Sequence, residues 1–237
     1  MSRLEIFGIE GLPEIGVGVD LGGMIRDAAD AQGTPLADRD VVVVTQKIVS
    51  KAEDMLVAID ASDPLSHKPL VERESVRILR RRGELIISET KHGFVCANAG
   101  IDLSNVEHGY AALLPEDSDR SSRRIRDRLR AVAGVEVGVI VSDTFGRTWR
   151  RGVTDVAIGC AGIAAVIDLR GTNDALGREM QVTEVALADE IAAAAELVMG
   201  KSTGIPVAVV RGLEADWFRT SSIKDEMIRQ PHEDLFR

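Results

Sequence analysis

The run of four valines at positions 41 to 44 constrains the fold of this chain more than any other stretch. β-branched residues favour strands, and a run without polar alternation predicts a strand that is buried on both faces. A second apolar run, residues 135–141, predicts another buried strand. Strands of this kind require other elements packed on both sides of their sheet.

Helices and strands alternate along the rest of the sequence. Asp20 is predicted to cap a helix that runs to about Gln32, with Gly33 as its stop. Further helices are predicted over residues 46–53, 70–82 (with Gly83 as the stop), 117–134 and 189–199, and further strands over residues 4–9, 85–88, 94–97, 110–114 and 206–210. This alternation by itself predicts an open α/β sheet. No repeat, low-complexity segment or linker divides the chain, so residues 1–237 are predicted to form a single domain.

Composition excludes several classes of function. A formal net charge of −9 and a pI of about 5.1 argue against a nucleic-acid partner, and two Trp, one Tyr and five Phe are too few for a base-stacking surface. The longest apolar run, residues 156–167, lies in a predicted core segment (153–167) and is too short to span a membrane. The N-terminus does not resemble a signal peptide. Cys96 and Cys160 share no metal-ligand spacing and are predicted to be buried thiols, which indicates a cytoplasmic protein.

Polar residues follow the second buried strand at once. The strand is predicted to end at Ser142-Asp143-Thr144, and Gly146 and the arginines Arg147, Arg150 and Arg151 come next. One carboxylate beside several guanidinium groups suits a bound cation together with bound anions. A strand end followed by a solvated basic turn explains the same residues, and this stretch alone favours neither interpretation.

Three other segments carry candidate ligand-binding groups. Residues 8–20 form a glycine-rich loop whose backbone N–H groups can approach a ligand, although a plain connection explains the composition as well. Lys47 and Lys51 lie four residues apart and share a helical face, where they either hold an anion between them or remain solvated. Residues 98–105 are dense in oxygen atoms, which Asx turns also explain. A functional role for this last segment depends on Asp102 meeting Asp143 in space.

The segment Gly200-Lys-Ser-Thr203 looks like the end of a phosphate-binding P-loop but fails two tests. The pattern needs a glycine five residues before Gly200, where Ala195 stands. A P-loop also follows a strand and precedes a helix, whereas here a helix precedes and a strand follows. The P-loop assignment is therefore rejected, while Lys201 and the local backbone N–H groups can still contact a phosphate.

Taken together, five motifs resemble those of one family, the coenzyme F420-0:L-glutamate ligases (F420:γ-glutamyl ligases), over residues 4–212. They are Gly11-Leu-Pro-Glu-Ile15, Val44-Thr-Gln-Lys-Ile-Val-Ser-Lys51, Ala99-Gly-Ile-Asp-Leu-Ser-Asn105, Ser142-Asp-Thr-Phe-Gly-Arg-Thr-Trp149 and Ile205-Pro-Val-Ala-Val-Val-Arg-Gly212. The family adds γ-linked glutamate to a deazaflavin cofactor precursor, coenzyme F420-0, with GTP and a divalent metal, Mg²⁺ or Mn²⁺. The resemblance implies an α+β fold with mixed and antiparallel sheets and an intertwined homodimer, in place of the open α/β sheet that periodicity predicts.

The resemblance also implies roles for individual residues. The GTP-binding set would comprise Leu12, Pro13, Glu14, Ile15, Gln46, Lys51 and Asn105. Asp102 and Asp143 would bind one metal ion and Thr144 a second, with K⁺ as a further candidate cation. Hard cations take oxygen ligands and share them with phosphates, which agrees with the interpretation from the residues alone.

The implied reaction has two steps. The carboxylate of the precursor attacks the γ-phosphate of GTP and gives an acyl phosphate and GDP, and the amine of L-glutamate then displaces phosphate. We add Lys51 and Arg147 as hypothetical catalytic residues, because phosphoryl transfer depends on positioning and charge neutralisation. Two alternatives stay open, a metal-dependent nucleotide phosphohydrolase that uses the same aspartates and a GTP-binding regulator without turnover. The sequence also leaves open how many glutamates are added.

Overall fold

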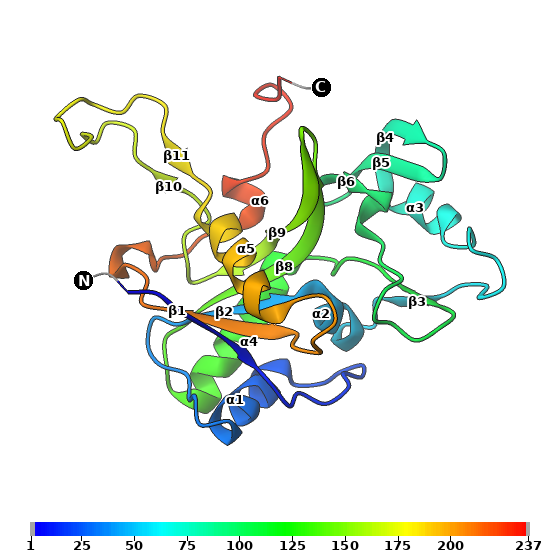
Figure 1. The fold of residues 1–237 in the computed structure, drawn as a ribbon, viewed down its shortest axis with the longest axis horizontal. Helices are drawn as coiled ribbons and strands as arrows, with labels where there is room; N and C mark the ends of the chain where they lie inside the picture. The colour runs from blue at the N-terminus through cyan, green and yellow to red at the C-terminus, as the bar shows by residue number, and fades with distance from the viewer. Residues whose placement is uncertain (1–2, 236–237) are drawn as a thin grey trace.

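A five-stranded mixed sheet lies at the centre of the computed structural model, which describes residues 3–235 (Figure 1). Its strand order is β1 (Glu5–Ile9), β12 (Val207–Arg211), β2 (Val41–Thr45), β8 (Gly138–Arg147) and β9 (Arg150–Ala161). Within this sheet β2 and β8 are parallel neighbours, and the other pairs are antiparallel. The α+β class with mixed sheets that the family resemblance implies is therefore confirmed, and the open α/β sheet predicted from periodicity is wrong.

Different helices cover the two faces of the sheet. On one face, Val42 and Val44 share a core with residues of α1 (Leu21–Ala31) and α4 (Ser118–Ala133). On the other face, Val41 and Val43 share a core with residues of α5 (Leu187–Met199) and α6 (Ile223–Glu226). All four valines are fully buried, as the uninterrupted run predicts, and Figure 1 shows the sheet between these helical layers.

The ends of the long helices follow capping residues in the sequence. Asp20 caps α1, as predicted, by accepting a hydrogen bond from the Gly23 N–H. Gly134 ends α4 in the left-handed conformation, at a φ of 71°. The start of α4 packs closely on β9, because Gly159 has no side chain to collide with the backbone of Ser118.

The hairpin of β8 and β9 corrects the prediction that the second buried strand ends at Ser142. β8 continues to Arg147, because β9 pairs with it along its whole length from Arg150 onward. A bulge interrupts the pairing just before Ser142. Because of this pairing, Asp143 and Thr144 lie within a strand. The hairpin extends beyond the central sheet in Figure 1, and the basic turn lies at its tip.

The helix predicted over residues 70–82 is also wrong. α3 covers only Lys68–Glu74, and β4 follows at once over Ser75–Arg82. β4 pairs with β5 (Leu85–Thr90), so that Gly83 and Glu84 form a two-residue hairpin turn. Gly83 has a φ of 56°, which suits such a turn as well as it suits the end of a helix.

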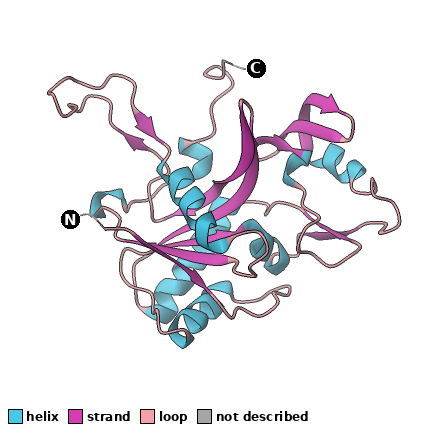
Figure 2. Ribbon diagram, viewed as in Figure 1, coloured by secondary structure: helices cyan, strands magenta, loops and turns pink. Residues whose placement is uncertain are grey.

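Smaller sheets surround the central one (Figure 2). β6 (Val95–Ala97) joins β4 and β5, while β3 (Leu56–Ala58) pairs with β7 (Tyr110–Ala112) and β10 (Ile167–Asp168) pairs with β11 (Glu184–Val185). Two 3-10 helices, η1 and η2, cover Asn98–Gly100 and Ala215–Trp217, and α2 (Gln46–Ala52) follows β2 directly. Residues 169–183 link β10 and β11 as an extended arm (Figure 1).

Four further predictions concern the cysteines, membrane spans, domain number and assembly. Cys96 and Cys160 are buried free thiols, as predicted. Within residues 3–235, no helix combines the length and the apolar character needed to cross a membrane. The single domain and the intertwined homodimer stay predictions.

Candidate functional site

Asp143 on β8 is a buried carboxylate that forms no ion pair with any residue in the described part of the chain. Its side chain accepts a hydrogen bond from the backbone N–H of Thr144 at 2.8 Å. Burial raises the pKa of Asp143 from 3.8 to about 7, an effect that this hydrogen bond opposes and that the charge of Asp102 reinforces. A buried carboxylate without an ion-pair partner in the described part of the chain favours binding of a cation supplied from outside the chain.

Asp102 approaches Asp143 from a different part of the chain. It follows η1 and forms an isolated β-bridge with Ala112 that fixes its backbone. Its carboxylate pairs with Lys47 Nζ at 2.6 Å and accepts the Ser104 N–H at 2.7 Å. Burial alone would raise the pKa of Asp102, but these two partners outweigh burial and hold the pKa below its usual value. Because the charges of Asp102 and Lys47 both act on Asp143, the structure brings the two predicted metal ligands into one environment.

A second group of charges lies beside Asp143. The Thr144 hydroxyl donates a hydrogen bond to Asp155 Oδ1 at 2.7 Å. Lys201 Nζ donates to Thr144 Oγ1 at 2.6 Å and to Asp155 Oδ1 at 2.7 Å, and it pairs with Glu196 Oε1 at 2.9 Å. Burial alone would lower the pKa of Lys201, but its bonds to Asp155 and Glu196 outweigh burial and raise the pKa. Thr144, predicted as a metal ligand, therefore faces an ammonium group of the protein itself.

The sequence did not assign Asp155 and Glu196 to the site. Asp155 stands in the segment predicted as apolar core, and the pairing of β9 with β8 places it directly opposite Thr144. Its side chain is only 4% exposed. A lone aspartate in an otherwise apolar stretch was the available signal, but its partner depends on a strand pairing that no local pattern shows.

α2 connects the acidic pair to the glycine-rich loop. Lys47 and Lys51 lie on one face of this helix, about 6 Å apart along its axis at roughly 1.5 Å per residue. Lys47 pairs with Asp102, and Lys51 pairs with Glu14 of the loop. Each lysine is therefore held by its own carboxylate and is not simply solvated, and an anion between the two lysines stays a prediction.

The other residues of the predicted nucleotide site differ in exposure. Pro13 is exposed, whereas Leu12 packs against the core and Ile15 is buried in it. Gln46 is fully buried, and its Oε1 accepts a hydrogen bond from Ser50 while its Nε2 has no partner among the residues described. An unsatisfied buried amide donor is costly, so Gln46 is a group that a ligand or a shift of the loop can satisfy.

Asn105 and Arg147 lie at the margins of the site. Asn105 is exposed at a φ of 54°, and its side-chain amide donates to the Lys201 carbonyl oxygen at 3.4 Å. This contact links residues 98–105 to the segment after α5. Arg147 lies near the tip of the β8–β9 hairpin, where its guanidinium donates to the Arg151 carbonyl oxygen at 2.6 Å. Of the two hypothetical catalytic residues, Lys51 lies on α2, whose Lys47 pairs with Asp102, and Arg147 is hydrogen-bonded to the Arg151 carbonyl at the hairpin tip.

The carboxylates of Asp102 and Asp143 fit a magnesium-type ion. Within residues 3–235, no group of three or more His, Cys, Asp or Glu side chains is arranged to hold a metal ion by itself. Mg²⁺ commonly binds one or two carboxylates and takes its remaining ligands from water and substrate phosphates. Two carboxylates within electrostatic reach of each other, one of them buried without a cationic partner among the residues described, meet that requirement.

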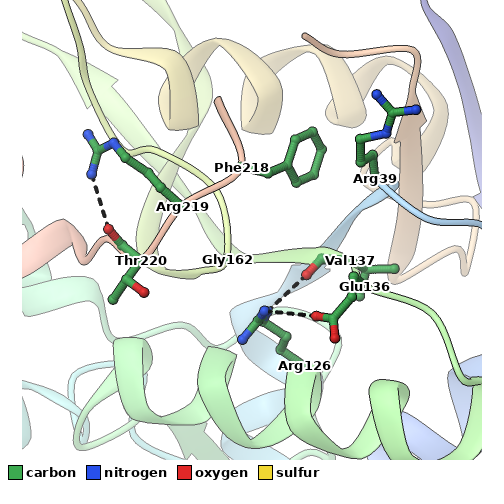
Figure 3. Close-up of a pocket in the computed structure, with 8 residues that line it drawn as sticks. All are labelled: Arg39, Arg126, Glu136, Val137, Gly162, Phe218, Arg219 and Thr220. Carbon is green, nitrogen blue, oxygen red and sulfur yellow. Dashed lines mark hydrogen bonds and ion pairs between the residues drawn. The ribbon is translucent and has the colours of Figure 1, made fainter. Parts of the chain in front are cut away.

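A cavity of about 300 Å³ lies at the other end of β8 (Figure 3). Its lining includes three arginines, Arg39, Arg126 and Arg219. Two of them are committed to protein groups, since Arg126 bonds Glu136 and a backbone carbonyl and Arg219 bonds Glu226 and backbone carbonyls. The cavity adjoins the start of β8, five residues before Asp143, or roughly 16 Å away at about 3.3 Å per residue. We therefore place the candidate site at the acidic pair and not at this cavity.

Comparison with known proteins agrees with the resemblance seen in the sequence. Residues 10–212 match the family model described as F420-0:Gamma-glutamyl ligase. The protein named coenzyme F420:L-glutamate ligase of Methanothermobacter thermautotrophicus is 41% identical over 99% of this chain and 99% of its own length. A protein of the same name from Methanopyrus kandleri is 41% identical over 100% of both chains, and one from Methanococcus maripaludis is 39% identical over 86% of this chain and 87% of its own.

Proposed function

Because this chain belongs to the F420-0:gamma-glutamyl ligase family, we propose that it joins L-glutamate to coenzyme F420-0 in the biosynthesis of coenzyme F420. The family match spans both Asp102 and Asp143. The observation that carries the proposal is the buried carboxylate of Asp143, which has no cationic partner of its own and lies within the electrostatic reach of Asp102. An enzyme that binds a divalent cation together with phosphate groups needs such a pair.

GTP supplies the driving force in this proposal. A carboxylate oxygen of the precursor forms a bond to the γ-phosphorus of GTP, the bond to the bridging oxygen breaks, and GDP leaves. The amine nitrogen of glutamate then bonds to the carbonyl carbon of the acyl phosphate, the carbon–oxygen bond to phosphate breaks, and the nitrogen loses a proton. The products are the amide, GDP and inorganic phosphate. Both steps require negatively charged reactants to be held together in line, so positioning and charge neutralisation are the main tasks of the protein.

Residues of the glycine-rich loop, of α2 and of the segment after η1 would position the nucleotide. The proposed set is Leu12, Pro13, Glu14, Ile15, Gln46, Lys51 and Asn105. Phosphate oxygens compete well for ammonium groups, so the triphosphate would replace Glu14 as the partner of Lys51 and Asp102 as the partner of Lys47. Arg147 becomes available to substrate only by giving up its bond to the Arg151 carbonyl.

Asp102 and Asp143 would hold Mg²⁺ or Mn²⁺ beside the phosphates. When bound, such an ion withdraws charge from the phosphoryl oxygens. Asp143 would contribute its carboxylate from the buried strand β8, and Asp102 would contribute its carboxylate from the segment after η1. The family resemblance adds K⁺ as a further cation and an intertwined homodimer to the proposal.

The test measures GDP release and product mass after incubation with GTP, L-glutamate, coenzyme F420-0 and Mg²⁺ or Mn²⁺. We expect GDP release to require both glutamate and the precursor, with a product heavier by the added glutamate. Asp143→Asn should lower turnover by a factor of about 10²–10³, because the loss of one charge stabiliser costs roughly 2.7–4 kcal/mol of barrier. Near-normal turnover of this variant would remove Asp143 from the metal role.

The same assay separates the two alternatives. GDP release without glutamate would favour a metal-dependent nucleotide phosphohydrolase that uses the same aspartates. GTP binding without release under any condition would favour a regulator. Mass spectrometry of the product also counts the glutamates added.

A further inference from the structure

The ammonium group of Lys201 occupies a pocket of oxygen atoms of the kind that usually binds a metal ion. Its three partners come from three different elements, Thr144 on β8 at 2.6 Å, Asp155 on β9 at 2.7 Å and Glu196 on α5 at 2.9 Å. An ammonium group has three hydrogen-bond donors, and all three are used here. A hydroxyl and two carboxylates that converge on one point form a cation site, and Lys201 fills it.

The hydrogen bonds around Thr144 leave little room for a competing ion. Its hydroxyl oxygen accepts a hydrogen bond from Lys201, and its O–H donates a hydrogen bond to Asp155 Oδ1, the same oxygen that Lys201 contacts. The Asp155 carboxylate is only 4% exposed. A metal ion that used the Thr144 oxygen would have to displace the ammonium group and would leave it without its buried partner.

We propose that the Lys201 ammonium takes the place of a second metal ion, so that this site binds one divalent cation, between Asp102 and Asp143, and not two. The inference rests on the proposed function for the first ion and replaces the second-metal role predicted for Thr144. Lys201 is a positioning residue in this scheme, because its charge is held against Thr144, Asp155 and Glu196 by the protein. Through its backbone carbonyl, which accepts from Asn105, it also connects the cation site to the predicted nucleotide site.

The deciding experiment counts bound Mn²⁺ per chain, by the loss of the free-ion electron paramagnetic resonance signal, with and without guanylyl imidodiphosphate. We expect one Mn²⁺ for the wild type and two for Lys201→Gln, because the neutral side chain vacates the oxygen pocket. Lys201→Arg keeps the positive charge and should stay at one. Lys224→Gln, which removes an exposed lysine elsewhere, is the matched control and should also stay at one.

Two Mn²⁺ in the wild type would overturn the inference, and so would a single Mn²⁺ in a folded Lys201→Gln protein. If that variant does not fold, Lys201→Met serves in its place, and the wild-type count alone can still refute the inference. No bound Mn²⁺ in any protein would instead refute the metal site of the proposed function, and the inference with it. A purely structural role for Lys201 predicts a lower melting temperature for Lys201→Gln without any change in the Mn²⁺ count.

Discussion

Replacing Asp143 with asparagine should stabilise the metal-free protein while it removes most of the proposed ligase turnover. Asparagine has nearly the shape of aspartate, and its side-chain oxygen can keep the hydrogen bond from the Thr144 N–H. It carries no charge, so its burial costs far less than burial of the ionised carboxylate. The side chain that the proposed reaction needs is therefore destabilising to the fold when no cation is bound.

The size of that cost follows from the pKa of Asp143. A rise from 3.8 to about 7, at about 1.4 kcal/mol per pH unit, corresponds to roughly 4 kcal/mol against the ionised form in the folded protein. Because the folded pKa is raised, the folded protein binds more protons than the unfolded chain between these two values. Stability of the wild type should therefore fall as pH rises from about 4 to 7, and the full penalty applies above pH 7. The variant should be more stable by up to about 4 kcal/mol at high pH and by little near pH 4.

Urea unfolding of both proteins at pH 5 and pH 8 without divalent metal measures this difference. Added Mg²⁺ or Mn²⁺ should stabilise the wild type through binding to the native state and should have little effect on the variant. Asp40→Asn is the matched control, because Asp40 is also fully buried but bonds Arg211 at 2.7 and 2.8 Å. Its replacement should destabilise the protein by about 1.5–3 kcal/mol, since it removes charge-assisted hydrogen bonds. Equal stability of the wild type and Asp143→Asn at pH 8, or a gain that does not change with pH, would refute the reasoning.

Three other changes test how the fold is held together. Gly159→Ala should destabilise the protein by about 3 kcal/mol, because the new Cβ would lie 2.3 Å from the Ser118 backbone; an unchanged melting temperature would contradict the close packing of α4 on β9. Asp119→Ala should cost about 3 kcal/mol or more, since its buried carboxylate accepts three backbone N–H bonds from β9 and α6, and limited proteolysis should then cut the segment from residue 223 onward. Resistance equal to the wild type would count against that role. Burial lowers the pKa of His92 in the folded protein, and the charge of Lys91 adds to the effect. As the pH drops below about 6.5, the unfolded chain therefore takes up the proton first, and the stability of the wild type falls. His92→Phe should lose less stability between about pH 7 and pH 5, and equal losses for both proteins in urea unfolding would show that His92 does not titrate in this way.

The central layers of the fold could be predicted because their signals are local. Four β-branched residues in succession predict a strand buried on both faces, and the alternate burial of Val42 and Val43 in two separate cores bears this out. Asp20 caps α1 because an N-cap depends only on residues within one turn. Such features need no information about distant parts of the chain.

The errors arose where one local signal fits two structures. Gly83 in the left-handed conformation ends a helix or turns a hairpin equally well, and pairing with β5 decides for the hairpin. The polar residues from Ser142 onward suggest the end of a strand, but β9 continues to pair with them. Strand pairing is a contact between distant segments, and it also determines that Asp155 lies opposite Thr144. For this reason the sequence pointed to Asp102, Asp143 and Thr144 but not to the carboxylate of Asp155 that Lys201 contacts.

The charges of the site limit how many cations it can accept. Four carboxylates, those of Asp102, Asp143, Asp155 and Glu196, lie around two ammonium groups, those of Lys47 and Lys201. With every group ionised, two negative charges remain, which one divalent cation balances. A second divalent cation would make the site positive before any nucleotide arrives, whether or not it displaced Lys201. Because the amino acids already supply part of the positive charge, the count of bound Mn²⁺ tests the electrostatic design of the site independently of its chemistry.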